Sequence, residues 1–334
     1  MDLVTGGTGI VGAHVLLALT ANGRAVRALV RHEGDRGTVA RIFRHYRPDA
    51  EDLLGRITWV KGDLLDVGSL ADAMEGVQHV YHTAALVSFD PRKARELYRV
   101  NVIGTAHVVN SALAAGVERL CHVSSTAAIG KGAPNEVYTE DLPWTDDSTT
   151  SDYSRSKYEA ELEIHRGIAE GLDAVMVNPC VILGPGASGR SSMALMERIR
   201  AGTRFHTSGS NAFVDARDVA DCMVRLMEKG ATGERYLLVG TNADYRTLFT
   251  AAARAFGVRE PQQAAPAWLL GIAWRLERVR SWLTGSSPLV TKATVHSSLA
   301  QRSYSNAKVI ALLGYRFRTL EESLDNVSAF MRGS

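Results

Sequence analysis

The chain has little cysteine, almost no net charge and no long apolar run, and each absence excludes a class of protein. Its 334 residues include three cysteines, Cys121, Cys180 and Cys222, with no Cys-x-x-Cys pair, so neither a disulfide framework nor a structural zinc site is expected. The 38 basic and 36 acidic residues leave a net charge of +2, which disfavours nucleic acid as a partner. The most apolar stretch, residues 264–274, is far shorter than the roughly 20 residues of a membrane span.

What remains is an ordinary globular composition, with 46% hydrophobic and 22% charged residues. Met1 to Val4 leads directly into glycines, without the basic and apolar regions of a signal peptide, so we expect a cytoplasmic protein without integral membrane association. The 10 histidines show no metal-ligand spacing, and no metal site is expected. The length allows about two domains.

The first half alternates short β-rich runs with helical patterns, which is typical of βαβ units. Right-handed crossovers then give an α/β fold with a doubly wound parallel Rossmann sheet. We expect residues 1–180 to form a dinucleotide-binding domain, with a return near 213–240. Residues 181–330 are expected to form a smaller, mostly helical substrate domain, interleaved with the first. Strands are predicted at 2–5, 24–30, 57–60, 78–82, 120–124, 174–178 and 236–239, and helices at 10–21, 69–75, 92–115, 153–170, 191–200, 216–228, 245–256, 267–283 and 320–331.

The first predicted strand runs into a glycine-rich turn, residues 5–12, and then a helix. Glycines permit a tight turn and let backbone N–H groups approach a pyrophosphate, and the helix N-terminus adds partial positive charge. The last glycine lets the helix pack closely on the strand. A purely structural turn is the alternative. The predicted cofactor contacts here are Gly6, Gly9, Ile10, Val11 and Gly12.

The residue after the second strand indicates which cofactor is bound. NAD sites usually carry an acidic residue there, which bonds the ribose 2′-hydroxyl, whereas this chain has Arg31. Because a guanidinium can pair with a 2′-phosphate, we predict NADP(H) over NAD(H). Asp63, after the third strand, is expected to accept from the adenine amino group, unless it serves only as an acid at a helix N-terminus.

Tyr153 and Lys157 are four residues apart on a predicted helix, and therefore share one face. A neighbouring ammonium is expected to lower the pKa of the tyrosine toward working pH, as acid–base catalysis requires. Ser125 closely follows a predicted strand, at the edge where ligands bind in doubly wound sheets. Its hydroxyl is expected to bond the substrate oxygen, and we favour it over Ser124 and Thr126.

Together these motifs resemble the extended short-chain dehydrogenase/reductase superfamily over nearly the whole chain. The resemblance implies further roles. Asn101 lies near the active site in this family and supports the lysine through water. Leu64 belongs to the adenine-contact segment, and Ala84 and Ala85 lie along the cofactor. Pro179 begins the segment over the nicotinamide, and Tyr153 and Lys157 contact the cofactor as well.

Within the superfamily, the chain is most similar to bacterial dihydroflavonol-4-reductase-like and 3β-hydroxysteroid-dehydrogenase-like members. The similarity implies reduction of a ketone or aldehyde on a small, lipophilic molecule, with Tyr153 as proton donor. One alternative is a nucleotide-sugar epimerase or dehydratase, which the pair Asn178-Pro179 favours but the missing acid after strand two does not. Another is a non-catalytic dinucleotide sensor. Members often dimerise through the helices near Asn101 and Tyr153, so a homodimer is a further expectation.

One predicted helix in the second half carries an apolar stripe. Leu269, Ile272, Leu276, Val279 and Leu283 recur at helical spacing, with arginines between them. We expect the stripe to face the core, as amphipathic helices normally do. The alternative is a basic amphipathic helix on a membrane surface.

Overall fold

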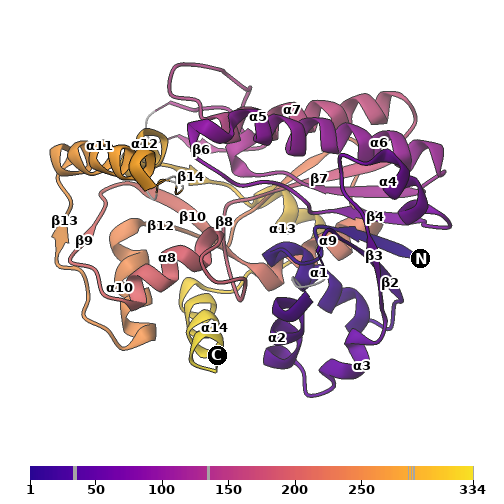
Figure 1. Ribbon diagram of the computed structural model, residues 1–334, viewed down its shortest axis with the longest axis horizontal. Helices are drawn as coiled ribbons and strands as arrows, with labels where there is room; N and C mark the ends of the chain where they lie inside the picture. The colour runs from indigo at the N-terminus through magenta and orange to yellow at the C-terminus, as the bar shows by residue number, and fades with distance from the viewer. Residues whose placement is uncertain (33–35, 134–135, 285, 287, 289, 334) are drawn as a thin grey trace.

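The computed structural model describes residues 1–32, 36–133, 136–284, 286, 288 and 290–333. Within them a seven-stranded, wholly parallel sheet runs through the molecule in the order β11-β7-β5-β4-β1-β2-β3 (Figure 1). The order extends from β1 in both directions, which is the doubly wound arrangement, so the predicted fold class is confirmed. The strands are β1 (Asp2–Thr5), β2 (Val26–Val30), β3 (Ile57–Lys61), β4 (His79–His82), β5 (Arg119–Val123), β7 (Ala174–Pro179) and β11 (Arg235–Leu238).

Helices cover both faces of this sheet, which explains why its central strands are buried along their length. On one face α4, α6 and α7 pack in a row, and on the other α1 packs against α9 (Figure 1). The layer helices are α1 (Ile10–Ala21), α2 (Arg36–Tyr46), α3 (Ala50–Leu54), α4 (Val67–Met74), α5 (Ala94–Leu97), α6 (Gly104–Ala114), α7 (Asp152–Ala169) and α9 (Ala216–Lys229).

The remaining part of the chain builds a smaller region beside the carboxyl edge of the sheet (Figure 1). A three-stranded sheet, β12-β10-β8, forms its framework. Its strands are β8 (Val181–Leu183), β10 (Ser210–Asp215) and β12 (Thr241–Asp244), and two-residue pairs join β6 (Val137–Tyr138) to β14 (Ser303–Tyr304) and β9 (Phe205–His206) to β13 (Gln263–Ala264). Its helices are α8 (Ser191–Arg200), α10 (Tyr245–Phe256), α11 (Ala267–Thr284), α12 (Lys292–Leu299) and α14 (Leu320–Arg332), whereas α13 (Ala307–Leu313) packs against α9 and β11 of the large sheet.

The helix predicted over residues 92–115 is interrupted. A 3-10 turn (Pro91–Lys93) and α5 precede a π-helix (Tyr98–Ile103), and only then does α6 begin. π-bulges inside helices are frequent at functional sites. Here the wide turn carries Asn101, whose buried side chain bonds the segment that follows β4.

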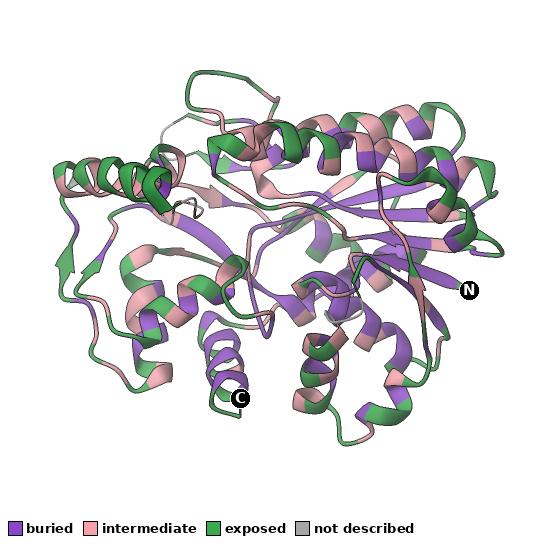
Figure 2. Cartoon of the chain, in the orientation of Figure 1, coloured by how far each residue is buried: buried purple, intermediate pink, exposed green. Residues whose placement is uncertain are grey.

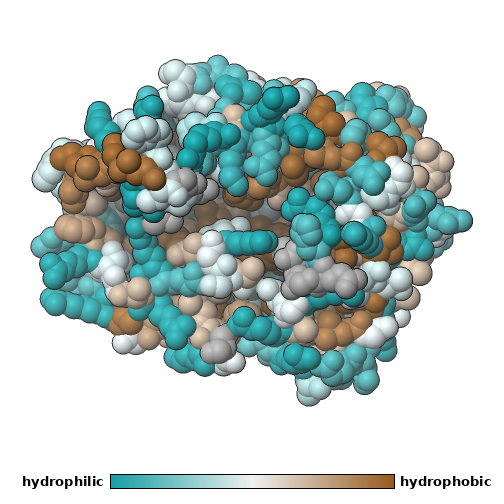
Figure 3. All heavy atoms as spheres, in the orientation of Figure 1, coloured by the Kyte–Doolittle hydropathy of each residue, from teal (hydrophilic) through white to brown (hydrophobic). Residues whose placement is uncertain are grey.

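The prediction that the stripe of α11 faces the core is wrong. Leu276 and Leu283 are 65% and 69% exposed, and Ile272 and Val279 are exposed as well. Figure 2 shows the helix mostly in the exposed colour, and Figure 3 shows an apolar patch over it. The physical reason is a polar anchor on the opposite side of the helix, where buried Ser281 accepts a hydrogen bond of 2.8 Å from Arg92.

Candidate functional site

The predicted glycine turn is a cradle that larger residues would fill. Gly6 has a φ of +68°, and a Cβ there would lie 2.6 Å from Cα of Ala84. A Cβ on Gly12 would collide with the carbonyl oxygen of Gly6. The same carbonyl accepts a 2.9 Å hydrogen bond from the Gly9 N–H, which closes the turn. Glycine is therefore required at Gly6 by conformation and at Gly12 by space.

The cradle opens directly into the N-terminus of α1. Gly9 is the N-cap and has no side chain to bond the first-turn N–H groups. The amides at Ile10 and Val11 therefore remain available to an anion, and the helix dipole adds partial positive charge. A dinucleotide pyrophosphate fits this combination of tight turn and free N–H donors.

The structure places the predicted adenosine contacts beyond the ends of β2 and β3. Arg31 follows β2, is exposed, and forms no ion pair with another described residue. Asp63 follows β3, and its Oδ1 accepts a 2.9 Å hydrogen bond from the Leu65 N–H. The cap of α4 is Asp66, which accepts from Gly68 and Ser69, so Asp63 is not the acid that caps this helix.

A chain of hydrogen bonds links the glycine turn to the π-helix through buried His82. The Thr105 hydroxyl donates to the Asn101 carbonyl (2.6 Å), so it must accept from His82 Nε2 (3.0 Å). His82 Nδ1 is then the acceptor for the Thr5 hydroxyl at 2.7 Å, and that oxygen in turn lies 3.4 Å from the Ala84 N–H. Burial lowers the pKa of His82 to about 3, so the ring stays neutral. Its Nε2 therefore always donates and its Nδ1 always accepts in this series of hydrogen bonds.

Tyr153 and Ser125 meet at the carboxyl edge of the sheet. Tyr153 lies in the first turn of α7, which Ser151 caps by accepting from the Ser154 N–H. Ser125 follows β5 and caps a 3-10 turn by accepting from Ala127. The Ser154 hydroxyl donates a 2.6 Å hydrogen bond to the Ala127 carbonyl and so ties the two segments together. Burial raises the pKa of Tyr153, and the Ser125 hydroxyl acts in the opposite direction. Of the three hydroxyl residues considered after β5, Ser125 is the one that affects the pKa of the tyrosine.

Lys157 is almost fully buried one turn further along α7, 2% exposed. Its Nζ donates a 2.8 Å hydrogen bond to the Val123 carbonyl. Burial lowers the pKa of Lys157 to about 8, while the Glu161 carboxylate raises it. The expectation that Lys157 lowers the pKa of Tyr153 is wrong for this structure, because burial of the tyrosine dominates and the ammonium is held against a backbone carbonyl.

Asn101 fastens two segments that border the site. Its Oδ1 accepts from the Leu86 N–H at 2.7 Å, and its Nδ2 donates to the Leu86 carbonyl and to the Ser156 hydroxyl, both at 3.0 Å. The segment after β4 is thereby tied to α7 beside Tyr153. This gives Asn101 a positioning role, and its support of Lys157 through water stays a prediction.

Three further residues lie behind the site: Asn178, which the sequence analysis considered only for the epimerase alternative, and Glu161 and Arg235, which it did not single out. Asn178, next to Pro179 at the end of β7, donates to the Ser125 carbonyl (3.0 Å) and to Glu161 (2.6 Å). Glu161 is 1% exposed and its other oxygen lies 3.2 Å from Arg235. Glu161 follows Lys157 by four residues, so helical spacing could have revealed it. Arg235 could not be found this way, because only the β11–β7 pairing brings it close.

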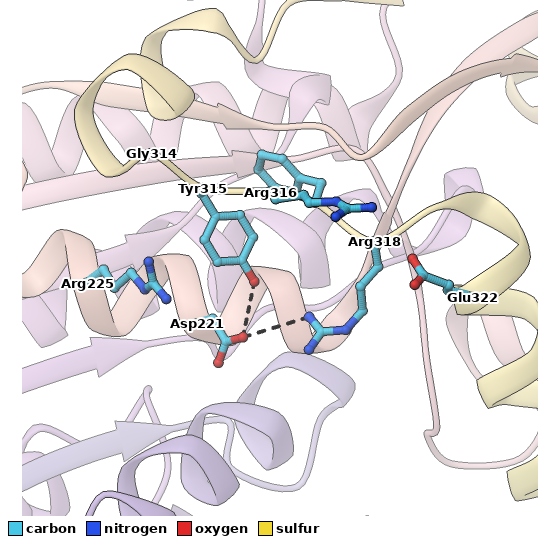
Figure 4. Close-up of a pocket in the computed structure, with 8 residues that line it drawn as sticks. Asp221, Arg225, Gly314, Tyr315, Arg316, Arg318 and Glu322 are labelled. Atoms are coloured by element: carbon cyan, nitrogen blue, oxygen red, sulfur yellow. Dashed lines mark hydrogen bonds and ion pairs between the residues drawn. The ribbon is translucent and has the colours of Figure 1, made fainter.

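Residues 213–220, at the start of α9, attach the C-terminal segment to the rest of the protein. Asp215 caps α9, and buried Asp218 accepts from the Tyr315 hydroxyl at 2.9 Å and from the Arg318 N–H at 2.9 Å. Arg318 also forms an ion pair with Asp218, and it lies 3.8 Å from Asp221 (Figure 4). These contacts fasten the C-terminal segment to α9. Both therefore lie on the side of the large sheet that α1 and α9 cover.

Other reactive groups do not gather into a site. Burial raises the pKa of the Cys121 thiol to about 12, and those of Cys180 and Cys222 also rise. Among the described residues, no cluster of histidine, cysteine and carboxylate side chains could hold a metal ion.

A doubly wound sheet, a glycine cradle before α1, and a Ser–Tyr–Lys set at the sheet edge define a nicotinamide-dinucleotide enzyme of the extended short-chain dehydrogenase/reductase type. The chain belongs to the NAD dependent epimerase/dehydratase family, whose model matches residues 3–239.

Three known proteins illustrate the relationship. "Sterol demethylase protein B" of Methylococcus capsulatus is 35% identical over 81% of this chain and 79% of that protein. "Putative dihydroflavonol 4-reductase" of Synechocystis is 33% identical over 96% of this chain and 91% of that protein. The crystal structure of gox2253 superposes with a TM-score of 0.80 at 28% identity, over 100% of this chain and 98% of that one.

Proposed function

We propose that the protein is an NADP(H)-dependent reductase of a ketone or aldehyde on a small lipophilic molecule. The observation that carries the proposal is that the segment after β5, which holds Ser125, is bonded to the first turn of α7 through Ser154 and Ala127 (2.6 Å), beside Tyr153 and with buried Lys157 one helical turn away. All three lie at the carboxyl edge of the sheet, where doubly wound folds bind their ligands.

Each of these residues has a distinct task in this mechanism. Ser125 and Tyr153 donate hydrogen bonds to the substrate carbonyl oxygen and polarise the carbonyl. The nicotinamide, when bound, supplies the hydride for the carbonyl carbon. Tyr153, kept protonated by burial, gives its proton to the developing alkoxide. Lys157 holds a positive charge beside the tyrosine and helps to hold the nicotinamide ribose.

The surroundings of Tyr153 support a lipophilic substrate. The Phe89 ring lies edge-on to the Tyr153 ring, with 5.5 Å between centroids. Phe89 and Val87 are both exposed apolar residues on the segment that Asn101 anchors. One relative carries a name that refers to a sterol, whose skeleton is a fused hydrocarbon ring system.

Arg31 supports the choice of NADP(H). It is exposed beyond β2, without an ion pair to another described residue, so its guanidinium is available to a 2′-phosphate. Titration of Arg31→Ala and wild type with NADPH and NADH at one salt concentration tests this. We expect the variant to lose about tenfold or more in NADPH affinity, with NADH affinity unchanged. Equal losses for both cofactors would contradict the role of Arg31.

A nucleotide-sugar epimerase is the second candidate, which Asn178-Pro179 at the end of β7 favours. Such an enzyme keeps its cofactor bound and returns it unchanged. Purified protein that carries tightly bound NAD and interconverts a UDP-sugar without net oxidation would select this candidate over the reductase.

A further inference from the structure

The outward side of α11 is an apolar surface in contact with solvent. The spacing of its large side chains, every three or four residues, places them on one side of the helix. Trp268 at one end is 67% exposed and Trp282 at the other is 79% exposed. The surface, called the α11 face below, consists of Trp268, Ile272, Leu276, Val279, Trp282 and Leu283.

The opposite side of α11 fixes this orientation. Ser281 is buried and Trp274 is half-buried. Arg92 donates to the Ser281 hydroxyl (2.8 Å) and to the Ser286 carbonyl (2.9 Å). The helix is therefore held by polar contacts and partly buried Trp274 on its inner side, while the apolar residues of the α11 face point away from the protein. Contiguous exposed apolar surface of this kind marks an interaction site.

We propose that the α11 face binds the interface of an anionic lipid bilayer. The helix carries Arg275, Arg278 and Arg280 against a single acid, Glu277, which pairs with Arg280. By helical spacing Arg275 lies among the apolar residues of the face, and Arg278 and Arg280 lie at its edges. Cations within and beside an apolar face match anionic head groups over acyl chains. The two terminal tryptophans are about 21 Å apart along the axis at 1.5 Å per residue, and tryptophan favours the membrane–water interface. A helix with such a face lies in the membrane plane.

The same charges disfavour a second copy of this chain as the occupant of the face. A two-fold contact through α11 would bring the arginines of one copy against those of the other, and like charges across an interface are costly. The helix also does not cross a bilayer, since no described helix is long and apolar enough to do so.

The structure connects the α11 face to the candidate active site. Arg92 bonds α11, and Phe89, three residues earlier, contacts Tyr153. Exposed Val87 belongs to the same short segment. A protein docked through α11 thus carries the apolar border of its site near the lipid, where a lipophilic substrate is concentrated. The docking itself does not depend on the reaction that the site performs.

Sedimentation with vesicles tests the proposal. Full-length protein is mixed with vesicles of phosphatidylcholine alone and of phosphatidylcholine with phosphatidylglycerol. We expect sedimentation with the anionic vesicles, and at least tenfold weaker binding by the double variant Leu276→Gln/Trp282→Gln. The matched control is Ile310→Gln, which changes an exposed apolar residue on α13, and it should bind like wild type. All the substituted side chains are exposed, and circular dichroism verifies the fold of each variant.

A charge variant and a mass measurement complete the experiment. Arg275→Gln/Arg278→Gln should weaken binding to anionic vesicles several-fold. Failure of wild type to sediment, equal binding to neutral vesicles, or binding unaffected by Leu276→Gln/Trp282→Gln would each overturn the proposal. Light scattering that shows a dimer dispersed by Trp282→Gln would also overturn it, because a second copy would then cover the face.

Discussion

Burial sets the protonation of the two central residues at this site. It keeps Tyr153 protonated and lowers the pKa of Lys157 to about 8. In the proposed reaction, the tyrosine must hold a proton and the lysine must hold a charge. The first condition is met over a wide pH range, whereas the second fails as the pH rises through about 8. The alkaline limit of activity therefore belongs to Lys157.

Glu161 should control that alkaline limit without touching the substrate. Its carboxylate raises the pKa of Lys157, so Glu161→Gln should move the alkaline limb of the pH–rate profile to lower pH by about half a unit to one unit. Glutamine can still accept from Asn178. Glu170→Gln, at the exposed end of α7, is the control and should leave the profile unchanged. A uniform loss of rate at all pH values, without a shift, would indicate a merely structural role.

Holding Lys157 in the interior should reduce stability. Its pKa is lowered from 10.5 to about 8, so the unfolded chain binds more protons between these values and stability rises with pH across that window. Below pH 8 the lysine is charged in both the folded and the unfolded state, and the full free-energy cost of burying the ammonium lowers the stability of the fold. Lys157→Met should therefore be more stable than wild type at pH 7, by about 2 kcal/mol. Urea unfolding at pH 7 and above pH 10 measures this, and a difference that does not shrink at the higher pH would contradict the explanation.

At the scale of elements, the cradle before α1 depends on glycine at one crowded point. A Cβ on Gly12 would collide with the Gly6 carbonyl, so Gly12→Ala should displace the turn and weaken dinucleotide binding by about tenfold or more. Gly37→Ala is the control, because a Cβ there meets nothing within 4 Å. Calorimetric titration measures both. Unchanged affinity in Gly12→Ala would show that the turn does not hold the pyrophosphate.

Sequence patterns predicted the long elements well and the short ones poorly. Helical periodicity located α8 and α10 at their observed bounds, because each has a clear apolar side. The strand β12, by contrast, consists of Thr-Asn-Ala-Asp and has no apolar run; only its pairing with β10 makes it a strand. Likewise, local helical spacing was enough to predict that Tyr153 and Lys157 lie together. The hydrogen bonds and ion pair from Asn178 through Glu161 to Arg235 join three elements, so local spacing could not predict them.

The direction in which α11 faces could not be predicted either. The stripe had the correct period, and an apolar stripe normally turns inward. Which side of a helix meets the protein depends on its neighbours, and here Arg92 binds the polar side through Ser281. The hydrophobic pattern therefore predicted the helix but not its surroundings.

At the scale of the whole molecule, the two parts of the chain are woven together. The chain leaves the large sheet at β7, builds part of the small region, and returns through α9 and β11. Asp218 of α9 then binds Tyr315 and Arg318 and so holds the C-terminal segment, and Figure 4 shows that Asp221 of α9 contacts the same two residues. The large sheet and the small region are therefore connected at several points, and the division into a dinucleotide-binding domain and a substrate domain stays a prediction.

The proposed reduction requires that the hydride leave the cofactor and stay in the product. NADPH carrying deuterium at the transferable C4 position, mixed with a lipophilic ketone, tests this most directly. We predict one deuterium on the former carbonyl carbon for each NADP⁺ released, and a loss of about a hundredfold or more in rate for Tyr153→Phe with cofactor binding retained. Deuterium that returns to a permanently bound cofactor, with no net oxidation, would contradict the proposal and indicate an epimerase.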